Sequence, residues 1–248
     1  MSKNSLKDKI ALVTGAAKRL GRATALALAR EGVNIMVHYN RSDDAADELC
    51  RELKMLGVNA WKVQANLQKT EESETLIEKA YKLAGPITIL INNASIYPKG
   101  KLEEITLDDI SLNIRINVWA PFVISREFAK RTKEGKIVNF LDTRIKGYDW
   151  AHTAYHLSKH MLALLTRMTA LTFAPRITVN AVAPGLILPP EGEDKSYLEK
   201  LKETVPLKNY GSPKDVTDAV LFLLKSDYIT GQIIYVDGGR HLKEAVYG

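Results

Sequence analysis

A tyrosine and a lysine four residues apart are the first residues in this sequence whose types and spacing suggest catalysis. Tyr155 and Lys159 fall within a stretch of helical periodicity, so their side chains share one face of a helix. A nearby ammonium group favours the phenolate and lowers the pKa of a tyrosine from about 10 toward the working pH. Tyr155 is therefore predicted to donate a proton beside a hydride acceptor. Such pairs also occur by chance on helix surfaces, so the prediction depends on the neighbouring motifs.

A glycine-containing turn near the N-terminus is suited to bind the phosphates of a dinucleotide. The segment Thr14–Gly21 (TGAAKRLG) lies between a short apolar strand and a helix. Glycine lets the backbone approach a pyrophosphate, and the helix N-terminus offers free N–H groups and a positive dipole end. Arg19 stands where the common dinucleotide fingerprint has a glycine. Alone, the turn is equally consistent with an ordinary strand–helix connection.

The end of the second predicted strand indicates which dinucleotide is bound. NAD enzymes carry an acidic residue there that binds the ribose hydroxyls, but this chain has HYNRS at residues 38–42. An acid would repel a 2′-phosphate, whereas Arg41 binds it through charge-assisted hydrogen bonds and Ser42 adds a hydroxyl. Lys18 and Arg19 add positive charge from the turn. We therefore predict NADP(H) rather than NAD, the alternative being that Arg41 only solvates a loop.

Strands and helices alternate along the whole chain, and this order determines where the chemical groups lie. Strands are expected at 10–13, 34–39, 60–65, 87–91, 136–141, 178–183 and 232–236. Helices are expected at 20–30, 45–56, 71–83, 107–131, 154–173 and 213–224, with a kink at Pro121. The alternation predicts a single domain over residues 1–248, with a parallel sheet covered by helices on both faces. Alternation alone leaves a closed (β/α)₈ barrel possible, so the motifs must decide.

Composition restricts the class of protein. The 248 residues are 46% hydrophobic and 26% charged, close to the average for globular proteins. No apolar run approaches the ~18–20 residues that a membrane span needs, and Ile10–Ala17 is interpreted as a strand rather than a signal peptide. The single cysteine, Cys50, cannot form an internal disulfide, which favours a cytoplasmic protein. The formal charge of +6 is scattered, which argues against nucleic acid as a partner.

Three histidines spaced four residues apart flank the tyrosine–lysine pair. His152, His156 and His160 could resemble a metal-binding stripe, but no carboxylate stands at matching spacing. We therefore predict no metal, and expect these histidines at a helix–helix interface.

Together the motifs resemble the short-chain dehydrogenase/reductase family over nearly the full chain. The matching pieces are Thr14–Gly21, Asn92-Asn93-Ala94, Asn117, Tyr155-x-x-x-Lys159, Pro184-Gly185 and Asp237-Gly238-Gly239. The resemblance implies a doubly wound Rossmann-type sheet in the order 3-2-1-4-5-6-7, and usually a homotetramer. It also implies that Tyr155 is the acid, that Lys159 holds the nicotinamide ribose and tunes Tyr155, and that Asn117 helps hold a water-mediated proton relay.

Asp142 departs from the family pattern at the end of the fifth strand, thirteen residues before Tyr155. The family usually has a serine there, whose hydroxyl donates a hydrogen bond to a ketone oxygen as negative charge grows on it. An ionised aspartate cannot donate and would repel that charge. Asp142 therefore argues against simple ketone reduction and favours a substrate whose nitrogen must gain a proton. The alternative is that Asp142 only pairs with Arg144.

Within the family, this combination resembles the pteridine reductases. The shared features are the turn at 14–21, the segment 38–42, the segment 92–98 with its aromatic Tyr97, and Asp142 before the Tyr-Lys pair. The resemblance implies that Arg19 and Ser95 contact cofactor phosphate or pterin, and that Tyr97 packs on the pterin face opposite the nicotinamide. The loop 186–196 and the tail 240–248 match little, and we expect them to set the substrate.

The resemblance implies a set of site residues. The catalytic residues are Asp142, Tyr155, Lys159 and Asn117. The cofactor contacts are Gly15, Arg19, Leu20, Gly21, Tyr39, Asn40, Arg41, Ser42, Asn66, Leu67, Asn93, Ala94, Ser95, Tyr155, Lys159, Pro184, Gly185 and Leu186, with Asn66 where the family often has aspartate near the adenine. The substrate contacts are Arg19, Ser95, Tyr97, Asp142 and Tyr155.

The predicted activity is NADPH-dependent hydride transfer to a C=N bond of a dihydropterin of the dihydrobiopterin or dihydromonapterin type. Two alternatives remain open at this point. One is a carbonyl reductase such as a 3-oxoacyl-thioester (acyl-carrier-protein) reductase. The other is a non-catalytic NADP(H)-binding sensor.

Overall fold

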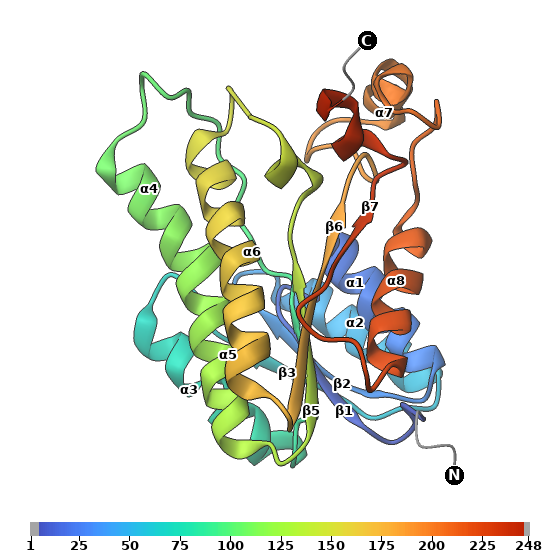
Figure 1. The fold of residues 1–248 in the computed structure, drawn as a ribbon. Helices are drawn as coiled ribbons and strands as arrows, with labels where there is room; N and C mark the ends of the chain where they lie inside the picture. The colour runs from blue at the N-terminus through green and yellow to red at the C-terminus, as the bar shows by residue number, and fades with distance from the viewer. Residues whose placement is uncertain (1–4, 246–248) are drawn as a thin grey trace.

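Seven parallel strands form one open sheet in the computed structural model, which describes residues 5–245 (Figure 1). They are β1 (Ile10–Val13), β2 (Asn34–Tyr39), β3 (Ala60–Gln64), β4 (Ile89–Asn92), β5 (Gly135–Phe140), β6 (Ile177–Pro184) and β7 (Ile233–Val236). Their order is β3-β2-β1-β4-β5-β6-β7, with every neighbouring pair parallel. The predicted doubly wound sheet is confirmed, and a closed barrel is excluded because β3 and β7 are edges.

Helices cover both faces of the sheet (Figure 1). They are α1 (Arg19–Arg30), α2 (Asp43–Met55), α3 (Thr70–Ala84), α4 (Leu107–Ile114), α5 (Ala120–Arg131), α6 (Thr153–Phe173), α7 (Lys195–Leu201) and α8 (Pro213–Lys225). Short 3₁₀ turns are η2 (Thr143–Lys146), η3 (Lys202–Thr204) and η4 (Arg240–Ala245). Helices α1, α2 and α8 pack on one face, and α3, α5 and α6 pack on the other.

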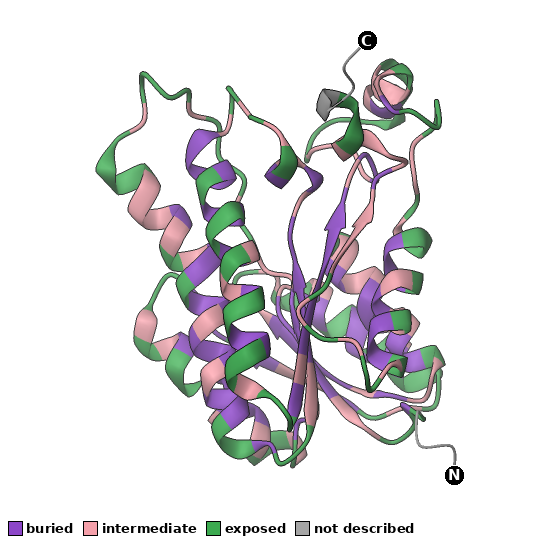
Figure 2. Cartoon of the chain, viewed as in Figure 1, coloured by how far each residue is buried: buried purple, intermediate pink, exposed green. Residues whose placement is uncertain are grey.

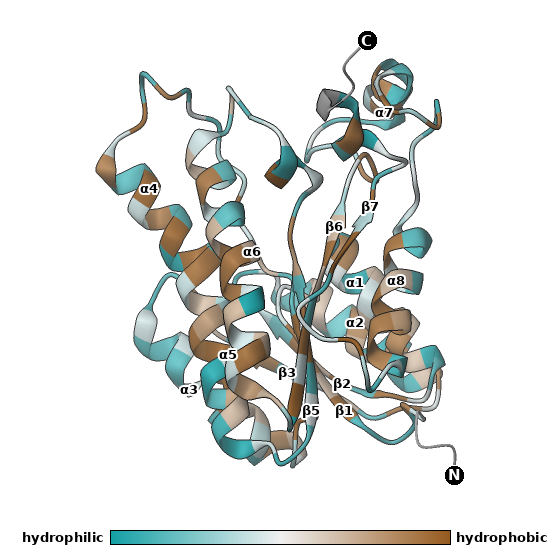
Figure 3. Cartoon of the chain, viewed as in Figure 1, coloured by the Kyte–Doolittle hydropathy of each residue, from teal (hydrophilic) through white to brown (hydrophobic). Residues whose placement is uncertain are grey.

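The core explains why the central strands β1 and β4 are almost entirely apolar. In β1, Ala11 and Val13 pack toward α1 and α8, whereas Leu12 packs toward α3 and α5. A parallel sheet buried on both faces has no polar side, so its strands lack the alternation of half-exposed strands. Figure 2 shows the buried residues along the sheet and the inward sides of the helices, and Figure 3 shows the same regions as hydrophobic.

The predicted helix at 107–131 is interrupted earlier than expected. The prediction placed a kink at Pro121, but the break is a π-helical turn, η1 (Arg115–Trp119), and Pro121 lies in the first turn of α5. Proline has no N–H to pair with the carbonyl of Asn117, four residues before it, so the α-helical pattern cannot continue through this point. The wider turn holds Asn117 buried beside the loop that follows β4.

Other differences from the sequence predictions are local. The loop 186–196 ends in α7, which begins at Lys195 after Asp194 accepts a hydrogen bond from the Ser196 N–H at 2.8 Å. The segment Ile10–Ala17 forms a strand followed by a turn, as predicted, and Cys50 is buried on α2. None of the helices within residues 5–245 is long and apolar enough to cross a membrane.

Candidate active site

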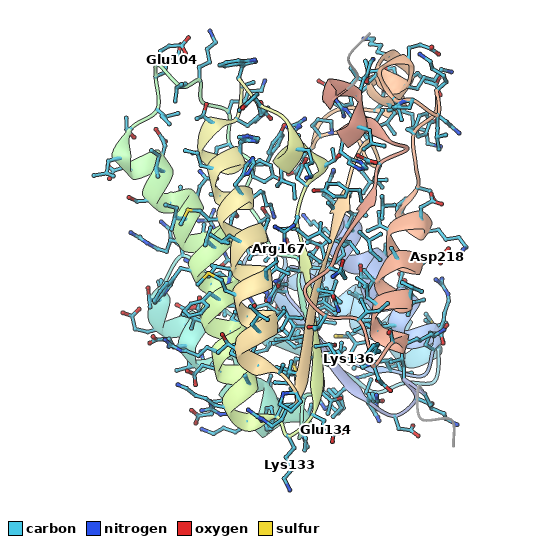
Figure 4. All side chains as sticks on the ribbon, viewed as in Figure 1. Glu104, Lys133, Glu134, Lys136, Arg167 and Asp218 are labelled. Carbon is cyan, nitrogen blue, oxygen red and sulfur yellow. The ribbon has the colours of Figure 1, made fainter. Side chains whose placement is uncertain are left out.

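The carboxyl ends of the central strands surround a cavity of about 460 Å³. In an open parallel sheet, ligands bind at this edge, where the strand order reverses. The opposite edge carries Lys133, Glu134 and Lys136, which Figure 4 labels at the start of β5. Predicted residues that line the cavity are Gly15, Arg19, Leu20, Gly21, Asn93, Ala94, Ser95, Tyr97, Asp142, Tyr155, Lys159, Pro184, Gly185 and Leu186.

Further residues line the same cavity without having been predicted as site residues. They are Lys18, Phe140, Leu141, Thr143, Arg144, Ile187, Leu188, Pro190, Tyr197 and Arg240. Ile187, Leu188 and Pro190 belong to the loop 186–196 and Arg240 to the tail after β7, the two segments that were expected to set the substrate. Lys18 belongs to the turn that was expected to add positive charge.

The turn between β1 and α1 is compact because two glycines let the backbone approach itself. Gly15 has a φ of +62°, and a Cβ on Gly21 would clash with the Gly15 carbonyl oxygen. Arg19 has a φ of +53° although it is not a glycine, so it adopts the left-handed conformation that the fingerprint glycine would supply. Its guanidinium donates to the Pro189 carbonyl at 2.6 Å, which links the turn to the loop 186–196.

His38, on β2, supports this turn through a hydrogen bond, and the sequence motifs assigned it no role. Its Nδ1 accepts a hydrogen bond from the Gly15 N–H at 3.0 Å, and its Nε2 lies 3.1 Å from the Ala65 carbonyl. Burial lowers the pKa of His38 to about 4, so the ring is neutral at pH 7 with its proton on Nε2. A histidine inside an apolar buried strand must find partners, and that was the available signal.

Thr14 joins the ends of β1 and β4. Its Oγ1 accepts hydrogen bonds from the N–H groups of Asn93 at 3.0 Å and Ala94 at 3.1 Å. The Asn93 side-chain amide donates to the Thr14 carbonyl at 2.9 Å. These bonds fix the segment that carries Ser95 and Tyr97 beside the turn.

A second group of predicted cofactor residues lies outside the cavity wall, at the ends of β2 and β3. These are Tyr39, Asn40, Arg41, Ser42, Asn66 and Leu67. Arg41 is exposed and forms no ion pair with the residues that the structure describes, while Ser42 precedes α2. The Asn66 amide oxygen accepts from the Gln68 N–H at 3.0 Å, and the Asn66 N–H donates to Glu72 at 2.6 Å.

Asp142 and Tyr155 are in direct contact within the cavity. The Tyr155 hydroxyl donates to Asp142 Oδ2 at 3.0 Å, and the Arg144 backbone N–H donates to Oδ1 at 2.8 Å. The Arg144 guanidinium instead pairs with Asp149 at 2.5 Å, so Asp142 is not simply its counter-ion. Burial raises the pKa of Asp142, although these hydrogen bonds and the charge of Lys159 oppose the rise.

The predicted lowering of the Tyr155 pKa is wrong in this structure. Burial, and then the negative charge of Asp142, raise the pKa of Tyr155 well above 10. Lys159 is further away, with Nζ 5.5 Å from the phenol ring centroid, and it donates to the Phe140 carbonyl at 2.8 Å. Burial lowers the pKa of Lys159 to about 8. Tyr155 is therefore protonated at neutral pH.

Asn117 lies behind the cavity rather than in its wall. Its Oδ1 accepts from the Ile96 N–H at 2.9 Å and the Ser95 hydroxyl at 3.1 Å, and its Nδ2 donates to Ser158 Oγ at 3.0 Å. The side chain thus ties the segment after β4 to α6. Its part in a proton relay stays a prediction.

The tail after β7 reaches the cavity because Asp237 anchors it. Asp237 accepts hydrogen bonds from the Gly239 N–H at 3.0 Å and the His241 N–H at 2.8 Å, and also from the Thr143 hydroxyl. This holds η4 beside η2 and places Arg240 at the cavity. Of the tail 240–248 that was expected to set the substrate, residues 246–248 lie outside the described residues.

The three spaced histidines do not act as one cluster. His152 contacts Tyr97 and Asp149, whereas the Nε2 atoms of His156 and His160 lie 3.1 Å apart. Within residues 5–245 no group of three His, Cys, Asp or Glu side chains is arranged to hold a metal ion.

The chain is similar to known proteins over nearly its full length. A family model described as Enoyl-(Acyl carrier protein) reductase matches residues 15–241. The 3-oxoacyl-[acyl-carrier-protein] reductase of Synechocystis sp. is 34% identical over 242 residues, covering 95% of this chain and 98% of that protein.

Two solved structures extend the comparison. FolM Alternative dihydrofolate reductase 1 from Brucella suis, in complex with NADP, is 31% identical with a TM-score of 0.91, and 98% of each chain is covered. A short chain dehydrogenase from Burkholderia cenocepacia, also in complex with NADP, is 30% identical with a TM-score of 0.88, covering 95% of this chain and 99% of that one.

Proposed function

The chain belongs to the short-chain dehydrogenase/reductase family, and we propose that within it the protein is an NADPH-dependent pteridine reductase. Its substrate is a dihydropterin of the dihydrobiopterin or dihydromonapterin type, reduced at a C=N bond. The observation that carries this proposal is the hydrogen bond from Tyr155 to the buried carboxyl of Asp142, where the family usually has serine. The FolM structures, named for dihydrofolate reduction, support a substrate with a pterin ring.

The residues at the sheet edge fit NADP(H). The turn at 14–21 brings backbone N–H groups and the N-terminus of α1 to one point, as a pyrophosphate needs. Arg41 is exposed without a carboxylate partner among the described residues, which suits a 2′-phosphate. Two of the structural relatives were solved with NADP bound. When bound here, NADPH supplies the hydride.

The chain's own residues supply the proton. Tyr155 is protonated at neutral pH, and the raised pKa of Asp142 lets its carboxyl carry a proton in turn. A neutral carboxylic acid can pass this proton toward a substrate nitrogen, and the carboxylate left behind would repel an oxyanion of the kind that forms in ketone reduction. Lys159 adds positive charge on the cofactor side of Tyr155.

Reduction of 3-oxoacyl thioesters is the second candidate function. The observation in its favour is the Synechocystis relative of that name, which is 34% identical across nearly the whole chain. Asp142 argues against it, because an ionised carboxylate at that position cannot donate to a ketone oxygen and repels the negative charge that forms on it.

A substrate panel with matched variants separates these functions. We expect NADPH oxidation with dihydrobiopterin or dihydromonapterin and little with a 3-oxoacyl thioester. Tyr155→Phe should lower kcat by about 10²- to 10⁴-fold, the usual contribution of a general acid, with NADPH binding retained. Asp142→Ser should lose pterin activity and gain ketone activity, whereas Asp218→Ser, on the exposed face of α8, should change neither.

Four results would contradict the proposal. Full turnover by Tyr155→Phe would refute the proton donor, and unchanged ketone activity in Asp142→Ser would refute the role given to Asp142. Reduction of the thioester but of no dihydropterin by the wild-type protein would establish the second candidate. NADPH binding without turnover of any substrate would favour a sensor.

We also propose a cytoplasmic homotetramer in which α6 packs against a second copy of this chain. An exposed apolar stripe runs along this helix, at Leu157, Met161, Leu164, Met168 and Leu171. Its spacing of three and four residues places these side chains on one face. Burying such a face against another copy removes it from water.

A further inference from the structure

One face of the Tyr97 ring is covered by His152. The two rings are stacked, with centroids 3.8 Å apart and planes inclined by 15°. The Tyr97 hydroxyl also lies 2.9 Å from His152 Nδ1. Because His152 occupies this face, a substrate can stack only on the opposite face of the Tyr97 ring.

Asp149 holds His152 in this position. One carboxylate oxygen, Oδ1, accepts hydrogen bonds from the backbone N–H groups of Ala151 at 2.9 Å and His152 at 3.1 Å. Both carboxylate oxygens also lie 3.2 Å from His152 Nδ1. Burial disfavours the charge of Asp149, but the Ala151 N–H and the charge of Arg144 outweigh it and keep the pKa of Asp149 below its usual value.

Arg144 contacts both Asp149 and Tyr97. Its guanidinium pairs with Asp149 at 2.5 Å, donates to the Tyr97 hydroxyl, and lies 5.1 Å from the Tyr97 ring centroid. The Arg144 guanidinium therefore links the Tyr97 hydroxyl to the Asp149 carboxylate.

The two loops that carry these residues are joined by backbone hydrogen bonds. The Gly100 N–H donates to the Ala151 carbonyl at 2.8 Å, and the Thr153 N–H donates to the Gly100 carbonyl at 3.0 Å. The loop after β4 and the loop after β5 are therefore held together as one unit above the carboxyl edge of the sheet (Figure 1). Tyr97 meets Tyr155 edge-on within this unit, with ring centroids 4.6 Å apart and planes at 81°.

We propose that Asp149 and His152 are positioning residues that set the Tyr97 ring as a fixed aromatic wall beside Tyr155, and so select flat heteroaromatic substrates. The selection of such substrates rests on the proposed function. A tyrosine without these contacts is free to rotate about its side-chain bonds, and a mobile ring offers no defined stacking surface. A flexible acyl chain does not need that surface.

Hydrogen exchange measures the positioning without any substrate. We expect His152→Ala and Asp149→Asn to speed backbone exchange within residues 95–106. His152→Phe, which keeps an aromatic ring on Tyr97, should retain protection. His160→Ala, a histidine change further along α6, serves as the control and should leave this segment unchanged. Equal exchange in the wild type and His152→Ala would overturn the positioning role.

Kinetics with a dihydropterin measure the selection. In His152→Ala, KM should rise about three- to tenfold, as expected for the loss of one aromatic contact, with kcat changed less than twofold. NADPH binding should be unaffected, and His152→Phe should restore the KM. A fall in kcat with KM unchanged, or a His152→Phe variant as impaired as His152→Ala, would overturn the proposal.

The two levels of inference fail separately. If the wild-type protein reduces no dihydropterin, the proposed function falls, and the selection of flat substrates falls with it. Exchange in residues 95–106 then still decides whether Asp149 and His152 position Tyr97. If the wild type is active and the variants behave like the control, only the positioning role is lost.

Discussion

Lowering the pH from 7 to 5 should cost the protein about 2 kcal/mol of folding stability through one side chain, His38. Burial lowers the pKa of this histidine to about 4, against an ordinary value of about 6.5 in the unfolded chain. Its Nδ1 lone pair accepts the Gly15 N–H at 3.0 Å, so protonation would also remove the acceptor that supports the turn. The effect therefore links folding to the shape of the turn between β1 and α1.

The sign follows from which state binds more protons. Between pH 6.5 and about 4, the unfolded chain protonates at His38 and the folded protein does not. The contribution is fully present above pH 6.5 and is lost as the pH falls through this interval. A pKa change from 6.5 to about 4 corresponds to about 3 kcal/mol in total, of which about 2 kcal/mol is lost by pH 5.

Urea unfolding at several pH values measures this loss. The comparison is between wild type and His38→Asn, because the Asn amide oxygen can accept from Gly15 N–H but does not titrate. The variant should be less stable at pH 7, and its stability should fall by about 2 kcal/mol less between pH 7 and 5. His160→Asn tests the other source of acid sensitivity. Burial and then the charge of His156 lower the pKa of His160, so this histidine adds a dependence of stability on pH of the same sign.

The decisive quantity is the difference in slope between wild type and His38→Asn. If both proteins lose the same stability between pH 7 and 5, the histidine is not buried in its neutral form as described. If His160→Asn flattens the dependence and His38→Asn does not, the acid sensitivity belongs to α6 rather than to the turn.

Two further predictions concern the cofactor and the assembly. Arg41→Ala should raise the KM for NADPH about tenfold and leave that for NADH unchanged, because it removes a charge-assisted hydrogen bond to the 2′-phosphate only; an unchanged preference between the two coenzymes would place the phosphate elsewhere. Leu164→Asp, in the middle of the exposed stripe of α6, should halve or quarter the mass found by light scattering; a monomeric wild-type protein would remove the basis for the tetramer.

Strands were predictable where their flanking residues left no choice. The bounds of β1 agree with the prediction because Lys9 precedes it and the Thr14-Gly15 turn ends it, while the residues between are apolar. The helix α7 was missed because Pro189, Pro190 and Gly192 dominate the segment before it, and seven residues carry little periodicity. Its burial depends on Leu198 meeting Val205 and Leu186, a contact between segments that no local pattern reports.

In the site, residue types were predictable and their electrostatics were not. A spacing of four places Tyr155 and Lys159 on one face of α6, but it does not say which group reaches the phenol oxygen. That group is Asp142, thirteen residues away and on another element. Burial and then the charge of Asp142 raise the Tyr155 pKa instead of lowering it as expected. The turn was recognised by its glycines, whereas its support by His38 needs the pairing of β1 with β2.

The contact between Asp142 and Tyr155 bears on the kind of substrate that this site can protonate. With Asp142 ionised, the Tyr155 proton points at the carboxylate and not at a substrate. With Asp142 protonated, its O–H can donate to the Tyr155 oxygen, and the Tyr155 proton is then released for a third group. The raised pKa of Asp142 brings that state closer to neutral pH. Each turnover by this route uses a proton stored on the carboxyl. That proton is already available before the hydride arrives, which suits a ring nitrogen that is basic at that stage, whereas a ketone oxygen becomes strongly basic only once it has received the hydride.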